Sequence, residues 1–238
     1  MAYSDDRLEE IFERSRELNP DFLDNTASLA FEMHSDWLSV LAAENIKRIN
    51  DADACDYVFH TASSTEFIFN ACSKLSLPNE VKYSAVFIFD SFMVQLVTYF
   101  YQKVMRSKHS LRRKFRQWEH VEATLSRQIA LRVLSAIQIA SKMHSYHESL
   151  SIETVKLCLK KYGYCYPDDS IMKSELRMLS MIDWNPTYHC TPLVYVESLF
   201  KIINKFLNLI NFQLFPETNK VVTLILCGLL EGKILYVV

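Results

Sequence analysis

Apolar residues recur every three to four positions along most of this chain, a spacing that predicts helices rather than strands. The strongest stripe spans residues 81–104 and predicts one long core helix. A second pattern, over residues 119–143, places apolar or small side chains on most sides of its helix: Leu125, Ile129, Ala130, Val133, Leu134, Ala136, Ile137, Ala140, Ser141 and Met143. Such a helix packs inside a bundle, and its small residues let neighbouring helices approach closely. Residues 119–143 therefore predict a central helix.

Shorter patterns place further helices before and after these two. They cover residues 5–17, 22–48, 57–75, 151–161, 168–182 and 193–207. Ser151 is expected to cap the first turn of its helix, and Gly163 to follow the end of that helix in a left-handed conformation. In the helix that opens after Pro167, the expected buried stripe is Met172, Leu176, Leu179 and Ile182. The pattern as a whole predicts an all-α protein.

The apolar pattern stops between Met105 and Trp118, where the chain turns basic. This stretch predicts a loop between the two long helices, and its cations are Arg106, Lys108, Arg112, Arg113, Lys114 and Arg116. Two interpretations stay open. The charges form an ordinary solvated surface, or they serve nuclear import or the binding of an acidic partner, because clustered lysine and arginine outside regular packing remain available to bind.

The amino-acid composition agrees with an all-helical fold and argues against several classes of protein. Half of the 238 residues are hydrophobic and only 3 are glycine, too few for the tight turns of an antiparallel sheet. The net charge of -2 argues against a general nucleic-acid surface or an anionic-membrane surface. The 6 cysteines include no C-x-x-C pair and no signal-peptide pattern opens the chain, so a reduced cytosolic or nuclear setting is expected. The apolar segment 221–230 is about half as long as a membrane-spanning helix, so no span is expected.

The sequence contains no familiar catalytic or metal-binding motif. No metal is assigned to the neighbouring histidines and cysteines, whose spacing fits no compact zinc module: His144, His147, Cys158 and Cys165. Asp168 and Asp169 are explained by the favourable interaction of carboxylates with the first turn of a helix. The chain also lacks a glycine-rich phosphate loop and a G-x-S-x-G motif. The sequence therefore predicts neither an enzyme nor a cofactor.

The order of these elements resembles the cyclin box, a five-helix fold that docks on protein kinases. The runs that carry the resemblance are residues 83–86, 92–94, 131–135, 138–142, Leu159 with 162–164, 174–176 and 191–199. The resemblance implies an all-α protein in three parts. These are an N-terminal helical extension over residues 1–52, a cyclin box over 53–190, and the start of a degenerate, truncated second box over 191–238.

Within the cyclin family, these runs are most similar to a divergent meiotic branch. That resemblance implies a nuclear, chromosome-associated protein of meiotic cells that promotes maturation of designated crossovers by contacting recombination proteins, with or without a cyclin-dependent kinase. Two other functions stay open: a conventional kinase-activating cyclin, and a cyclin-fold transcription factor that binds promoter DNA. The transcription factor would call for two complete boxes and usually an N-terminal zinc ribbon. The sequence lacks both, so no direct nucleic-acid binding is expected.

The chain departs from kinase-activating cyclins at two contact positions. Those cyclins carry a lysine just before the second box helix and a glutamate three residues after the lysine of the Ala-Ser-Lys run. Ser76 and Ser145 stand at these positions here. The resemblance still places a kinase-facing surface near the ends of the third and fifth box helices, with these residues: Lys74, Lys142, Ser145, Glu148, Lys173 and Glu175. Strong kinase activation is not expected of this chain.

Overall fold

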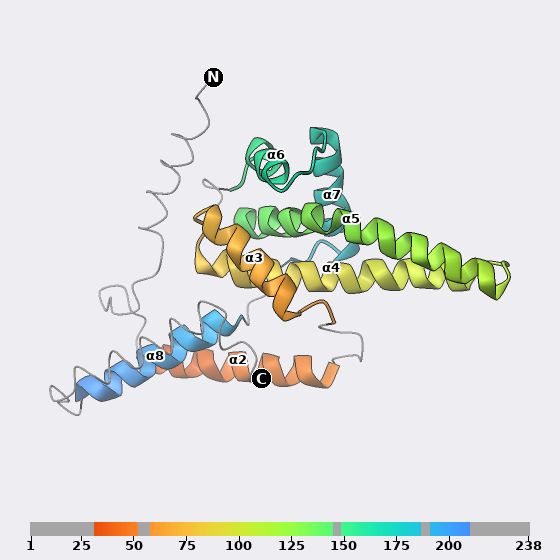
Figure 1. The fold of residues 1–238 in the computed structure, drawn as a ribbon. Helices are drawn as coiled ribbons and strands as arrows, with labels where there is room; N and C mark the ends of the chain where they lie inside the picture. Colours follow the sequence, from red (N-terminus) through yellow and green to blue (C-terminus); the bar gives the residue numbers. More distant parts are fainter. Residues whose placement is uncertain (1–30, 52–57, 145–148, 187–190, 210–238) are drawn as a thin grey trace, which may run out of the picture. The chain divides into compact units, whose positions relative to one another are not determined.

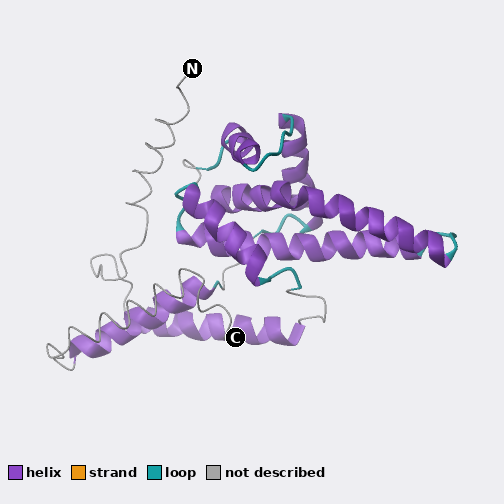
Figure 2. Ribbon diagram, viewed as in Figure 1, coloured by secondary structure: helices purple, strands orange, loops and turns teal. Residues whose placement is uncertain are grey.

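The computed structural model describes residues 31–51, 58–144, 149–186 and 191–209, and within them every regular element is an α-helix (Figures 1 and 2). The helices are α2 (Phe31–Asp51), α3 (Ala62–Lys74), α4 (Asn79–Met105), α5 (Leu111–His144), α6 (Ile152–Lys161), α7 (Asp168–Met181) and α8 (Pro192–Leu209). The all-α prediction is confirmed. The helix expected at residues 5–17, the apolar segment 221–230 and most of the expected second box lie outside the described residues.

The helices fall into two compact units. One unit takes in residues 1–53, 73–83 and 188–238, and in its described parts α2 and α8 pack against each other. The Tyr195 hydroxyl of α8 donates a hydrogen bond to the backbone carbonyl of Leu41 in α2, where the Leu41 side chain is buried. The other unit contains residues 54–72 and 84–187, and therefore α5, α6, α7 and most of α3 and α4. The three-part division expected from the sequence stays a prediction.

The centre of the second unit is α5. Every residue from Ala130 to Ser141 is buried, and α6 and α7 both pack on this helix. The predicted central helix is therefore confirmed. Ile129 and Met143, which the pattern placed in the buried stripe, are 38% and 47% exposed. The prediction was wrong for these two residues because the buried stretch covers only Ala130 to Ser141, in the C-terminal half of a helix that is 34 residues long, and both residues lie just outside it.

The neighbour of α5 along most of its length is α4 (Figure 1). The Ser84 hydroxyl lies 2.7 Å from Nε2 of His144, and the rings of Tyr101 and Trp118 meet edge to face. By length and apolar composition α4 would suffice to cross a membrane, a test that a soluble core helix also passes. Its apolar stripe is buried inside the protein, at Val81, Ala85, Ile88, Phe89, Phe92 and Leu96. The prediction of a core helix is confirmed.

The buried stripe of α7 is offset from the predicted one. Ser174 and Met178 are buried, whereas Met172 and Leu176 are 39% and 56% exposed, so the prediction was wrong for the latter pair. Ser174 lies on the same side as the buried Ile171, Met178 and Ile182, and its hydroxyl accepts a hydrogen bond from the buried guanidinium of Arg132 in α5. A pattern based on apolar residues alone places a serine on the outer face of its helix.

The basic stretch predicted to be a loop is mostly helical. Because α4 ends at Met105 and α5 begins at Leu111, the connection is confined to residues 106–110. The first turns of α5 contain the basic residues Arg112, Arg113, Lys114 and Arg116. The loop prediction was wrong because arginine and lysine are good helix formers even without an apolar stripe. The ring contact between Tyr101 and Trp118 also ties this end of α5 to α4.

The boundaries of α6 agree with the sequence signals. Ser151 Oγ accepts a hydrogen bond from the Thr154 backbone N–H at 3.2 Å, which satisfies one of the donors that a helix start leaves free. After the helix ends, Gly163 adopts a φ of 83°, a conformation that costs glycine little. Both predictions for this helix are confirmed.

Replacing Ser151 with alanine should lower the free energy of unfolding by about 1 kcal/mol, because the Thr154 N–H loses its acceptor. Urea denaturation followed by circular dichroism would measure the change. Ser149→Ala is the matched control, since the Ser149 hydroxyl has no hydrogen-bond partner among the described residues and its loss should cost less than about 0.5 kcal/mol. Equal effects of the two substitutions would show that the cap contributes nothing.

Candidate functional site

Two of the six residues expected to face a kinase come together in the structure. Lys142 in the last turn of α5 and Glu175 in α7 form an ion pair, with Nζ and Oε1 2.5 Å apart. The side chains are 44% and 12% exposed, so solvent screens the pair and it contributes at most about 1 kcal/mol to stability. An ammonium group has three donors and a carboxylate has two oxygens, so both groups keep capacity for a partner molecule.

The other four residues of that expected set are placed differently. Lys173 pairs with Asp169 one turn earlier on α7, at 3.5 Å, and both side chains are largely exposed. Lys74 lies in the last turn of α3 and belongs to the other unit. Ser145 and Glu148 lie outside the described residues. The docking surface can therefore be built only on the Lys142–Glu175 pair and its neighbours.

Exposed apolar side chains lie close in sequence to both members of the Lys142–Glu175 pair. On α7, Met172 is three residues before Glu175 and four before Leu176, so it neighbours both on the helix surface, and Leu176 directly follows Glu175. Both apolar residues are exposed, as is Met143 beside Lys142 on α5. A charged pair flanked by exposed methionine and leucine has the mixed character of protein-binding surfaces, where methionine is enriched. We call these five residues the α5–α7 surface.

Beneath this surface lies a polar network that the sequence did not predict. Arg132 in α5 is only 6% exposed, and its Nη1 donates to Ser174 Oγ of α7 at 2.7 Å. Its Nη2 donates to Gln128 Oε1 at 2.9 Å, and the guanidinium lies over the Phe92 ring, 5.5 Å from the centroid. The hydroxyls of Ser135 and Ser174 are also hydrogen-bonded, at 2.7 Å. An arginine inside the apolar run of residues 130–141 was the available sequence signal.

The Arg132 guanidinium is a buried cation with no carboxylate partner among the described residues. Its Nε has no hydrogen-bond partner there either. Burial, and next the nearby Arg177, lower the pKa of Arg132 to about 10, so the group is still charged at neutral pH. Desolvating a charge is costly unless hydrogen bonds replace water. Ser174 and Gln128 therefore offset part of the cost of burying this cation, and the bond to Ser174 also joins α5 to α7.

Ser76, where kinase-activating cyclins carry a lysine, has left-handed backbone geometry. Its φ is 52°, and the Ser76 N–H donates to the Ser73 carbonyl at 3.1 Å. Any residue with a Cβ pays an energetic cost in this conformation, so serine bears it here and a lysine would bear it equally. The difference from those cyclins at this position is the missing side-chain charge.

The histidines and cysteines considered for metal binding do not form a cluster where they can be described. Burial raises the pKa of the Cys158 thiol, whereas Cys165 is exposed and His144 bonds to Ser84. His147 lies outside the described residues. Across the described ranges no group of three or more histidine, cysteine, aspartate or glutamate side chains is arranged to hold a metal ion.

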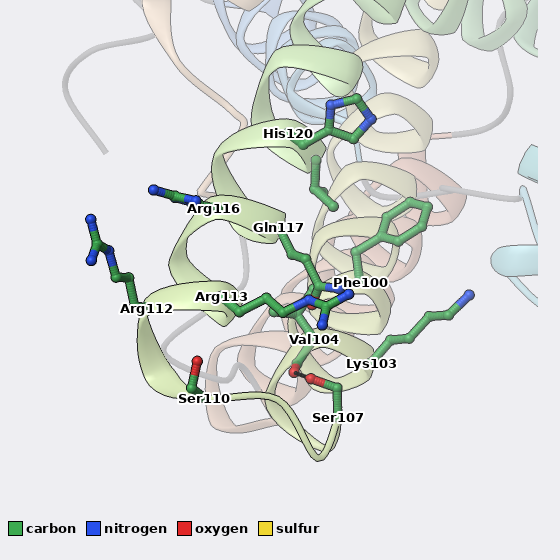
Figure 3. Close-up of a pocket in the computed structure, with 11 residues that line it drawn as sticks. Phe100, Lys103, Val104, Ser107, Ser110, Arg112, Arg113, Arg116, Gln117 and His120 are labelled. Atoms are coloured by element: carbon green, nitrogen blue, oxygen red, sulfur yellow. Dashed lines mark hydrogen bonds between the residues drawn. The ribbon is translucent and has the colours of Figure 1, made fainter.

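A second candidate surface lies where α4 ends and α5 begins (Figure 3). Side chains of both helices line an open groove there, with Phe100 and Val104 of α4 and Val121 of α5 as apolar residues. The cations along it are Lys103, Arg112, Arg113 and Arg116. Figure 3 shows Arg113 reaching across toward α4, while Arg112 and Arg116 project outward from α5. We call this feature the basic groove.

Comparison with known proteins identifies two similar curated proteins, both named Cyclin N-terminal domain-containing protein 1. The Homo sapiens protein is 27% identical over 175 residues, which cover 74% of this chain and 53% of the human protein. The Mus musculus protein is 26% identical over 163 residues, covering 68% of this chain and 48% of the mouse protein. The chain spans about half the length of the curated relatives it matches.

No family model matches the chain, and no solved structure matches it. The two relatives support the cyclin-like relationship suggested by the sequence runs, and the helices observed agree with an all-α cyclin-like fold.

Proposed function

We propose that this cyclin-like chain is a non-catalytic adaptor that promotes maturation of designated crossovers in meiotic recombination. It acts in the nucleus, on the chromosomes of meiotic cells, by contacting recombination proteins, with or without a cyclin-dependent kinase. The observation that carries the proposal is the α5–α7 surface, a charged pair flanked by exposed apolar side chains on a cyclin-like helical unit. Surfaces of this composition favour protein partners over small-molecule substrates.

Two features weigh in favour of an adaptor over a conventional kinase-activating cyclin. Lys142 and Glu175 neutralise each other, so the pair presents no net charge to attract a kinase. Ser76 stands where a kinase-contacting lysine is usual, so the positive charge of that contact is missing here. These features support weak or no stimulation of a cyclin-dependent kinase by the purified chain.

A charge swap tests the surface without breaking its ion pair. In the native chain the two charged groups are 2.5 Å apart. The double variant Lys142→Glu with Glu175→Lys keeps one positive and one negative charge at these positions but exchanges their places. We expect its free energy of unfolding to stay within about 1 kcal/mol of the native value, as for exposed pairs in general. Pulldown from meiotic tissue followed by mass spectrometry should recover recombination proteins with the native chain and far less of them with the variant.

The matched control is a swap of the pair between Lys156 of α6 and Asp168 of α7, which are 2.7 Å apart and outside the α5–α7 surface. This control should recover the same partners as the native chain. Equal recovery by the Lys142–Glu175 swap would remove the α5–α7 surface from the proposal. Recovery of an active cyclin-dependent kinase that the native chain strongly stimulates would establish the conventional-cyclin function instead.

A further inference from the structure

The cations of the basic groove lack carboxylate partners in the part of the chain that the structure describes. Arg112, Arg113, Arg116 and Lys103 form no ion pair with any described residue, and no acidic side chain lines the groove. Lysines elsewhere in the same unit are neutralised, as in the pairs of Lys142, Lys156 and Lys173. The only polar contact of Lys103 that the structure shows is with the Tyr99 ring, 6.0 Å from the centroid. The groove therefore carries a concentrated positive charge of its own.

The cluster of arginines is unfavourable for the stability of α5, the helix that contains it. The N-terminal end of a helix carries a partial positive charge, which favours acidic residues and disfavours basic ones in the first turn. The first turn of α5 has no acidic residue, whereas α6 begins with Glu153 and α7 with Asp168 and Asp169. Clustered arginines at the start of α5 thus weaken their own helix slightly, and an anion bound in the groove would offset this effect.

The rest of the groove is apolar. Phe100, Val104 and Val121 line it between the cations, so an occupant can bury hydrocarbon there while its anionic groups meet arginine. Arginine binds carboxylates with paired, parallel hydrogen bonds, which adds orientation to the attraction. A polynucleotide is a poorer match, since this chain has a net charge of -2 and a pI of about 6.4 rather than the basic surface typical of such proteins.

We propose that the basic groove docks an acidic segment of a partner protein, one that presents apolar side chains beside its aspartates or glutamates. The groove is separate from the α5–α7 surface. Arg113 and Lys142 are 29 positions apart on one helix, which corresponds to about 43 Å at 1.5 Å per residue. The two surfaces can therefore bind different partners, and failure of one proposal leaves the other standing.

Fluorescence anisotropy with the full chain tests the groove. The probe is a short fluorescein-labelled peptide with glutamate along one helical face and leucine along the adjacent face. Comparison peptides carry glutamine or phosphoserine in place of glutamate, and a labelled DNA duplex is the nucleic-acid probe. We expect the native chain to bind the glutamate peptide, to bind the glutamine peptide at least about tenfold more weakly, and to lose affinity as salt is raised.

The decisive variant is Arg113→Gln with Arg116→Gln, which should bind the glutamate peptide about tenfold more weakly than the native chain. Its thermal midpoint should be unchanged or slightly higher, because basic residues leave the first turns of α5. The matched control, Lys160→Gln with Lys161→Gln on α6, removes two exposed charges elsewhere and should bind within about twofold of the native chain.

Four results would overturn the proposal: no binding of the glutamate peptide by the native chain, equal binding by the Arg113–Arg116 variant, tighter binding of DNA, or binding of the phosphoserine peptide alone. Tighter DNA binding would reassign the groove to nucleic acid. A preference restricted to phosphoserine would reassign it to a phosphorylated partner. A lower thermal midpoint in the variant would show that the arginines stabilise α5, so that no bound anion would be needed to offset them.

Discussion

Replacing Ser174 with alanine is expected to lower the free energy of unfolding by about 2 kcal/mol, since hydrogen bonds to charged groups contribute roughly 1.5 to 3 kcal/mol. Ser174 Oγ lies 2.7 Å from Nη1 of Arg132, and both side chains are buried, so water cannot readily replace the lost hydroxyl. Urea denaturation followed by circular dichroism measures the change. Ser180→Ala is the control on the same helix, because Ser180 is exposed and its loss should cost less than about 0.5 kcal/mol.

A companion variant separates the hydrogen bond from the charge. Arg132→Met removes the buried cation together with its desolvation cost, while the 2.7 Å bond between Ser135 and Ser174 remains. Replacing buried charges with apolar residues of similar size is often neutral or stabilising. We therefore expect Arg132→Met to cost less than Ser174→Ala. The reverse order would mean that the contacts of the guanidinium, including the Phe92 ring, outweigh the cost of burying it.

Replacing Ala140 with tryptophan should destabilise the protein by about 3 kcal/mol, because overpacking a filled core forces side chains and backbone to move. Ala140 is 0% exposed and lies in the buried stretch of α5. Thermal unfolding monitored by circular dichroism should show a clearly lower midpoint. The measurement requires only that the variant remain soluble enough to compare with the native chain.

The control for Ala140→Trp is Glu122→Trp, an exposed position on the same helix. Tryptophan there has room in solvent, and the free energy of unfolding should change by less than about 0.5 kcal/mol. Equal, small effects at both positions would show that α5 is not the central helix. A large effect at Ala140 alone would support close packing of its neighbours on this stretch.

The core of the fold was predictable because its signals are local and repeated. The apolar stripe of α4 and the small residues of α5 predict core helices, and Ser151 and Gly163 predict the limits of α6. The start of α5 was missed because its first residues are mostly charged and exposed and form no apolar stripe. The offset on α7 was missed because the buried stripe of Ile171, Met178 and Ile182 includes a polar residue, Ser174.

The candidate site was predictable only in part. Resemblance to cyclins placed Lys142 and Glu175 on one kinase-facing surface, and the structure joins them in an ion pair, but the apolar residues next to them were expected in the core. The groove needed three-dimensional information, since Lys103 and Arg113 come from different helices and meet only when α4 and α5 lie side by side. The charge of a sequence segment does not indicate which side chains of another helix lie across from it in the fold.

The length of α5 has a mechanical consequence. Its 34 residues contain neither proline nor glycine, the residues at which helices usually bend, so α5 should behave as a stiff rod. Packing of α4 alongside it adds to that stiffness. Proteins attached at opposite ends would be held at a nearly constant separation, whatever the motion of the rest of the chain. The molecule would then fix the spacing between two components of a larger assembly.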